Sequence, residues 1–149
     1  MIMLSKVMFA YFATVFFAIS INTPKKSIYF TGINGAVGWL IYFLFSYYLG
    51  ADVLGSFVGA LVVALLSEYS ARKFKMPATV FLTSGIIPLV PGAGLYYTML
   101  ELVQNNYENA INTGIKTIFI SGSIAVAIAI SSSIFKRQSK SSFNKNTNS

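Results

Sequence analysis

Long apolar runs alternate with short polar segments along this chain. Four runs are continuous enough to predict membrane-spanning helices, and another run is interrupted by prolines and glycines. A helix crosses the hydrocarbon core of a bilayer with about 20 predominantly apolar residues, so each run suffices for one crossing. The short polar segments predict tight connections between neighbouring helices. The predicted spans cover about residues 2–21, 29–49, 53–70, 77–100 and 113–135.

The composition favours a membrane protein over a soluble domain. Of the 149 residues, 55% are hydrophobic and 10% are charged, and the mean hydropathy is +0.66. Soluble domains carry about 25% charged residues. We therefore expect an all-α integral membrane protein with one transmembrane domain of about five helices, residues 1–135. Residues 136–149 are mostly Ser, Asn and Lys, which predicts a disordered basic tail.

The interrupted run contains two prolines three residues apart. Pro88 and Pro91 are followed by Gly92, Ala93 and Gly94. Proline lacks an N–H group and clashes with the carbonyl four residues earlier, so this Pro-x-x-Pro-Gly motif predicts a break in the fourth helix. Backbone groups freed in a membrane need partners inside protein or in a water-lined cavity, which makes the break a candidate binding site. A packing kink without a ligand is the alternative.

The helix that resumes after the break offers donors to an anion. Pro91 suits the first helical position, and the N–H groups that follow it lack helical partners. Nearby hydroxyl groups flank this position, and an amide from the second span could reach it. The candidate substrate-binding residues are Thr83, Ser84, Pro88, Pro91, Gly92, Gly94, Tyr96, Tyr97 and Asn34.

Two charged residues are candidate partners for a substrate. Lys116 lies in the first turns of the last predicted span, where its side chain could snorkel to the interface. If it faces a cavity instead, it would be the counter-charge for a carboxylate. Glu68 precedes Arg72 by four residues on one helical face, which favours a juxtamembrane ion pair over a proton-coupling carboxylate.

Glycines recur at helical spacing in the second and third spans. Small residues let two helix backbones approach closely, so these positions predict helix packing, within the chain or in a homo-oligomer. The packing glycines are Gly32, Gly35, Gly38, Gly55 and Gly59.

Basic residues predict the orientation in the membrane. By the positive-inside rule, the side with more Lys and Arg in its loops is cytoplasmic. With five spans, Lys6 and Lys116 fall on the outer side. The N-terminus is then outside and the C-terminal tail cytoplasmic, with these basic residues inside: Lys25, Lys26, Arg72, Lys73, Lys75, Lys136, Arg137, Lys140 and Lys145.

The net charge of +7 follows from this topology and needs no nucleic-acid partner. The first run could also be a cleavable signal peptide. Lys6 lies within the run and no charged segment precedes it, which favours a retained helix.

The inventory of reactive side chains is short. The chain has no histidine, no cysteine and four carboxylates. We find no nucleophile with its base, no metal-ligand cluster and no phosphate-binding Gly-Lys-Ser/Thr motif. The sequence therefore predicts neither an enzyme nor a metal or cofactor site.

Three segments resemble a known family. Residues 77–81, 85–92 and 96–98 closely resemble the signature of the small membrane subunit of the threonine/serine exporter family. Residues 22–24 and 32–38 lie where that family has a similar Pro-containing loop and a second span. The resemblance covers roughly residues 1–136.

This resemblance implies a secondary exporter in the bacterial cell membrane, split into two chains. The partner would be a larger subunit with a cytosolic domain and its own membrane helices. Small amino acids, or dicarboxylates such as succinate, would be the cargo. The alternative is a structural subunit that anchors or assembles the transporter without touching cargo.

Overall fold

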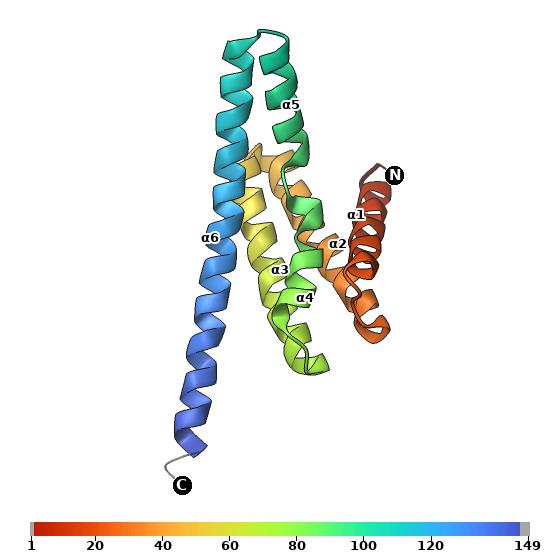
Figure 1. Cartoon of the computed structure of the whole chain (residues 1–149), viewed down its shortest axis with the longest axis vertical. Helices are drawn as coiled ribbons and strands as arrows, with labels where there is room; N and C mark the ends of the chain where they lie inside the picture. Colours follow the sequence, from red (N-terminus) through yellow and green to blue (C-terminus); the bar gives the residue numbers. More distant parts are fainter. Residues whose placement is uncertain (1, 147–149) are drawn as a thin grey trace.

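The chain folds into helices throughout the part that its structure, a computed structural model, describes. This part comprises residues 2–146, with side chains described for residues 3–135. The prediction of an all-helical protein is confirmed over these residues. The elements are α1 (Ile2–Ser20), α2 (Lys25–Leu49), α3 (Asp52–Phe74), α4 (Ala78–Gly85), the 3-10 helix η1 (Ile87–Leu89), α5 (Gly92–Val103) and α6 (Tyr107–Asn146), as labelled in Figure 1.

Four of these helices, α1, α2, α3 and α6, are each long and apolar enough to cross a membrane. A further span is formed if the segments before and after the break are counted together. Ala78–Leu89 and Gly92–Val103 meet at an angle of 48°. The chain is therefore a multi-pass membrane protein with four or five candidate spans.

The turns between helices contain residues in the left-handed backbone conformation. Asn22, Gly50, Lys75 and Asn105 have positive φ angles of 56°, 62°, 54° and 60°. Each follows a helix within two residues of its end. A residue in this conformation turns the chain out of the helix and lets its N–H group reach a carbonyl of the last turn. The connections are consequently short, and neighbouring helices run antiparallel.

Helix α3 forms the centre of the bundle and packs against α2, α4, η1 and α6. Helix α1 covers the other face of α2 and touches α4 and η1. Helices α3 and α6 run parallel, because Lys116 lies beside Asp52 at one end and Phe135 lies beside Arg72 at the other. The buried apolar cluster fills the space between these elements: Ala60, Val63, Leu89, Ile124 and Ala127.

Glycines make the close contacts at two helix pairs. A Cβ atom on Gly32 would lie 2.6 Å from the ring of Tyr11, so this position holds α1 against α2. A Cβ atom on Gly59 would lie 2.8 Å from the carbonyl oxygen of Gly38, where α2 and α3 cross. Gly35 packs on α1, and Gly55 packs on the backbone of Tyr42. All these glycines therefore lie in contacts within the chain.

Helices α5 and α6 form a hairpin that extends past the turn between α2 and α3 (Figure 1). Among the described elements, α5 packs only against α6. Small residues bring the two helices together, since a Cβ atom on Gly94 would overlap Thr117 and one on Gly114 would lie 3.2 Å from Thr98. No residue of α5 is buried. Its outward face is largely apolar and exposed: Leu95, Tyr96, Tyr97, Met99, Leu102 and Val103.

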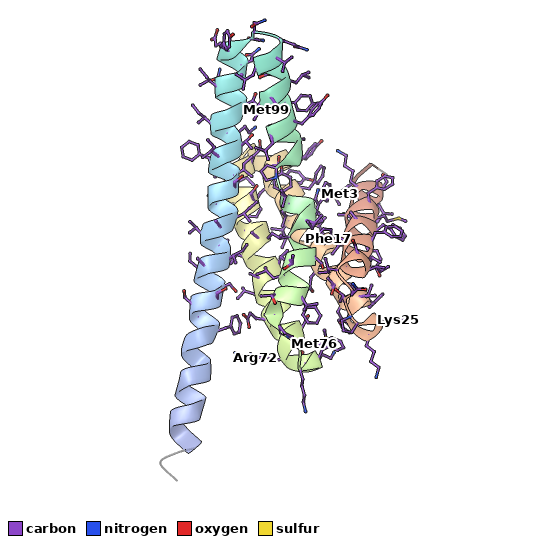
Figure 2. All side chains as sticks on the ribbon, viewed as in Figure 1. Met3, Phe17, Lys25, Arg72, Met76 and Met99 are labelled. Atoms are coloured by element: carbon purple, nitrogen blue, oxygen red, sulfur yellow. The ribbon has the colours of Figure 1, made fainter. Side chains whose placement is uncertain are left out.

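The turns lie at two opposite ends of the bundle. Figure 2 shows Lys25, Arg72 and Met76 at one end, and Met3 and Met99 toward the other. The hydroxyl of Ser27 lies 3.6 Å from the sulfur of Met76, so the turns that follow α1 and α3 are adjacent. The basic residues of both turns therefore share one end of the molecule.

Some predicted boundaries differ from those observed. Helix α2 begins at Lys25 instead of residue 29, because Pro24 lies before the helix and leaves its first turn free to form. Helix α6 begins at Tyr107, within the predicted polar loop 101–112, and the turn itself is only 104–106. Helix α6 also continues to Asn146, where the sequence predicts a disordered tail. No proline or glycine follows Gly122, so no strong stop signal ends this helix.

The expected ion pair between Glu68 and Arg72 does not form. The guanidinium of Arg72 lies instead 4.9 Å from the ring centroid of Phe135. The parallel packing of α6 on α3 brings this ring to Arg72, where the ring face attracts the cation. Among residues 3–135, the one ion pair joins Lys116 to Asp52.

Candidate functional site

A cavity of about 340 Å³ lies beside the break. Its walls come from the end of α2, the start of α3, the segment from η1 to α5, and the first half of α6. Pockets for small ligands have volumes of about 300–1,000 Å³, so this cavity suits a small molecule.

The break frees backbone donors at the cavity wall. Val90 is extended and Pro91 precedes α5, so the helical hydrogen-bond ladder stops between η1 and α5. The N–H group of Gly92 donates to the carbonyl of Val90 at 2.8 Å, and that of Leu95 donates to Pro91 at 3.2 Å. No backbone acceptor in the described part of the chain takes the N–H groups of Ala93 and Gly94, which line the cavity.

The cavity also contains an ion pair. The Nζ atom of Lys116 on α6 lies 2.5 Å from Oδ2 of Asp52 at the start of α3. The hydroxyl of Ser46 on α2 donates to the other carboxylate oxygen of Asp52. The Lys116 side chain is 60% exposed, whereas that of Asp52 is 22% exposed. Asp52 is thus held from two sides, while the Lys116 side chain lines the cavity and is largely exposed.

Lys116 lies further from the start of its helix than the predicted span boundary at residue 113 implies. Helix α6 begins nine residues earlier, at Tyr107, which places Lys116 about 13 Å along the helix. Asp52 provides a direct partner for its charge.

Hydroxyl groups of three further residues surround the pair. Thr117 donates to the carbonyl of Thr113 at 2.7 Å, and Ser56 donates to the backbone carbonyl of Asp52 at 2.7 Å. Thr113 donates to Glu101 at 3.3 Å. All three residues line the cavity. Because these hydroxyl protons are occupied, the oxygens are left as acceptors toward a ligand.

The structure brings some of the predicted site residues together. Pro88, Pro91, Gly94 and Lys116 all line the cavity. The other candidates lie outside its lining: Asn34, Glu68, Thr83, Ser84, Gly92, Tyr96 and Tyr97.

The reasons for these positions are local. Asn34 is buried against Gly85 on the far side of the break. Ser84 is buried and donates to Val80, and Thr83 donates to Thr79. Gly92 faces open space, with nothing within 4 Å of a Cβ atom placed there.

Sequence reasoning missed Asp52 as a site residue. Asp52 falls in the short polar segment between the predicted spans 29–49 and 53–70, and the sequence predicts no partner for its carboxylate. Only the parallel packing of α3 and α6 places it beside Lys116, 64 positions later in the chain. The available signal was the scarcity of carboxylates, since the chain has four and one lies at the start of a predicted span.

The cavity is amphoteric. Lys116 and the free N–H groups of Ala93 and Gly94 attract a carboxylate, and the start of α5 adds the positive end of its helix dipole. Asp52 and the hydroxyl oxygens attract an ammonium group. Within residues 3–135 no group of side chains could hold a metal ion. The arrangement can bind and orient a small charged solute.

Comparison with known proteins identifies the family. The chain matches the family described as "Threonine/Serine exporter, ThrE" over residues 6–134. It belongs to the threonine/serine exporter family. A relative from Corynebacterium glutamicum, described as a threonine/serine exporter, is 28% identical over 118 residues, which cover 79% of this chain and 22% of the relative. No solved structure matches the chain.

A second relative is also longer than this chain. An uncharacterised protein from Haemophilus influenzae is 27% identical over 144 residues, which cover 91% of this chain and 48% of the relative. The chain therefore spans about half or less of the relatives it matches.

Proposed function

We propose that this chain is the membrane subunit of a secondary exporter of small amino acids, of the threonine/serine type, in the bacterial cell membrane. The observation that carries the proposal is the amphoteric cavity at the helix break. Broken helices whose half-helix ends face a solute are the usual construction of transporter binding sites. Family membership and the description of the Corynebacterium relative support the cargo class.

We further propose that a larger subunit completes the exporter. The relatives extend well beyond the region matched here. Within the described part of the chain, α5 packs only against α6, and its apolar outer face is left uncovered. The larger subunit would bring its own membrane helices against α5, together with a cytosolic domain. A homo-oligomer through the same face is the alternative assembly.

We propose an orientation with the N-terminus outside and the C-terminus in the cytoplasm. The basic residues that flank α1–α2 and α3–α4 lie at one end of the bundle, and Figure 2 shows Lys25 and Arg72 on opposite sides of that end. The positive-inside rule assigns that end to the cytoplasm. The cavity, at the start of α3, then lies nearer the outer face.

A structural subunit without contact to cargo is the second candidate function. It is favoured by the extent of close packing, in which Gly32, Gly35, Gly38, Gly55 and Gly59 all serve contacts within the chain. This reading gives the cavity and its charged pair no role. Export of dicarboxylates such as succinate is the alternative cargo and is tested below.

Flux measurements test whether export requires this chain. Everted membrane vesicles from the native host, with and without this gene, would be energised and supplied with labelled threonine or serine. An exporter subunit predicts that uptake into the vesicles requires this chain. Equal uptake without the chain, with the larger subunit still inserted, would refute the proposed function.

A further inference from the structure

Opposite charges from two different helices meet inside the cavity. Asp52 belongs to α3 and Lys116 to α6, and they are each other's charge partners in this structure. Charged side chains within membrane spans are rare, and they mark substrate or ion pathways. The pair lies beside the break, with the free N–H groups of Ala93 and Gly94 in the same wall. Its position is therefore that of a recognition element.

The two partners differ in freedom of movement. Asp52 accepts from Ser46 on one oxygen and from Lys116 on the other. The Ser46 bond would keep the carboxylate in place if Lys116 withdrew. Lys116 has a flexible four-carbon stem, and its side chain is 60% exposed. The pair can thus open by a rotation of Lys116 alone.

We propose that Asp52 is the specificity-determining residue of this cavity, taking the ammonium group of a zwitterionic amino acid in place of Lys116. The displaced Lys116 then meets the substrate carboxylate, together with the N–H groups of Ala93 and Gly94. This inference rests on the proposed export function and assigns its selectivity to one carboxylate. Ser46 acts as a positioning residue, because it holds Asp52 without touching the substrate.

Charge balance explains the selectivity. The closed pair is neutral, and a zwitterion inserted between the partners keeps every charge next to an opposite one. A dicarboxylate would place a second negative charge beside Asp52, where no cation compensates it. Like charges in a partly desolvated site repel strongly. The intact Asp52 therefore selects against succinate, although Lys116 and the free amides alone would accept it.

Competition in everted vesicles tests this assignment. Uptake of labelled threonine would be inhibited with unlabelled threonine and with unlabelled succinate. In the wild type, threonine competes far better than succinate. Asp52→Asn removes the partner of the ammonium group and leaves Lys116 unpaired. The potency of succinate relative to threonine should then rise about tenfold or more, the scale of one hydrogen bond to a charged group.

Two control variants keep the test specific. Asp52→Glu retains the carboxylate and should keep the wild-type preference for threonine. Glu108→Gln removes an equal charge from an exposed position outside the cavity and should change nothing. A purely structural ion pair would lower the amount of inserted protein in Asp52→Asn but leave the relative potency unaltered. An unaltered ratio in inserted Asp52→Asn protein overturns the inference.

Ser46→Ala covers the case in which Asp52→Asn fails to insert. It keeps both charges but frees the Asp52 carboxylate, so the KM for threonine should rise about threefold or more, the low end of the range for one lost hydrogen bond. An unchanged KM would also overturn the inference. If wild-type vesicles take up no threonine, the proposed export function itself is refuted. Failure of the export function and failure of the inference about Asp52 are therefore distinguishable.

Discussion

Leu89, the last residue of the 3-10 turn, packs onto Gly59 of α3. A Cβ atom on Gly59 would lie 3.1 Å from a methyl group of Leu89, and one on Gly38 would lie 3.3 Å from the other methyl group. Leu89 is buried and also lines the cavity. The glycine crossing of α2 and α3 therefore anchors the break, and with it the cavity wall.

Bulk at Gly59 should disrupt this anchor. Gly59→Leu would push α3 away from Gly38 and displace Leu89, at a cost of about 1–3 kcal/mol or more. We expect a large loss of folded, monodisperse protein after detergent extraction, together with a lower thermal unfolding temperature. Leu65→Val, on an exposed face of α3, is the control and should behave like the wild type. Equal yields from both variants would remove the argument for this crossing.

Two glycines only two positions apart should respond differently to the same substitution. Gly94→Val would overlap Thr117 and separate α5 from α6, whereas a Cβ atom at Gly92 would meet nothing within 4 Å. We expect Gly94→Val to lower the unfolding temperature and Gly92→Val to leave it unchanged. Matching unfolding temperatures for both variants would contradict the observed packing of the hairpin.

This contrast shows what the sequence could predict. Pro88 and Pro91 predict the break, because proline has no backbone N–H donor in any structural context. The sequence names Gly92 and Gly94 alike as candidate site residues. The structure places Gly94 in the contact with α6 and leaves Gly92 facing open space, because this difference depends on how α6 returns past α5. Periodicity within one helix carries no information about that return path.

Thiol labelling tests the proposed orientation. The chain has no cysteine, so single cysteines can be introduced without background. Lys26→Cys, Lys73→Cys and Asn106→Cys all lie at exposed positions in or beside turns. An impermeant reagent on intact cells should label only Asn106→Cys, and the other two only after permeabilisation. Labelling of Lys73→Cys but not Asn106→Cys would invert the topology.

Asn34 lies outside the cavity lining, and its substitution tests whether it takes part in transport. Its amide nitrogen is buried and has no hydrogen-bond partner in the described part of the chain. Asn34→Ala removes a buried donor without a partner, which favours the folded state, and it also removes packing contacts, which disfavours it. Each effect is about 1–3 kcal/mol, so the two offset each other. Asn34→Ala should therefore keep the wild-type unfolding temperature within a few degrees and leave threonine flux unchanged. A large drop in flux at normal stability would place Asn34 on the substrate path.

The site was only partly predictable for a similar reason. The sequence alone identifies Lys116 as a candidate site residue, because it is a cation inside an apolar run. The sequence places Asp52 at the end of a turn, since nothing local links it to a residue 64 positions away. Its role depends on the parallel packing of α3 and α6, which is a property of the whole bundle. The helices and the break followed from local patterns; the partner of Lys116 did not.

The central claim is that cargo passes through the cavity at the break. Ala93 lines this cavity and is exposed to it, so Ala93→Phe fills the space without disturbing a buried contact. Ala125→Phe, at an exposed position of α6 outside the cavity lining, adds the same bulk elsewhere. Threonine uptake into everted vesicles, normalised to inserted protein, is the direct measurement. The account predicts that Ala93→Phe lowers uptake at least tenfold, about the effect of losing one good contact, whereas Ala125→Phe retains it. Wild-type uptake with Ala93→Phe would contradict the account.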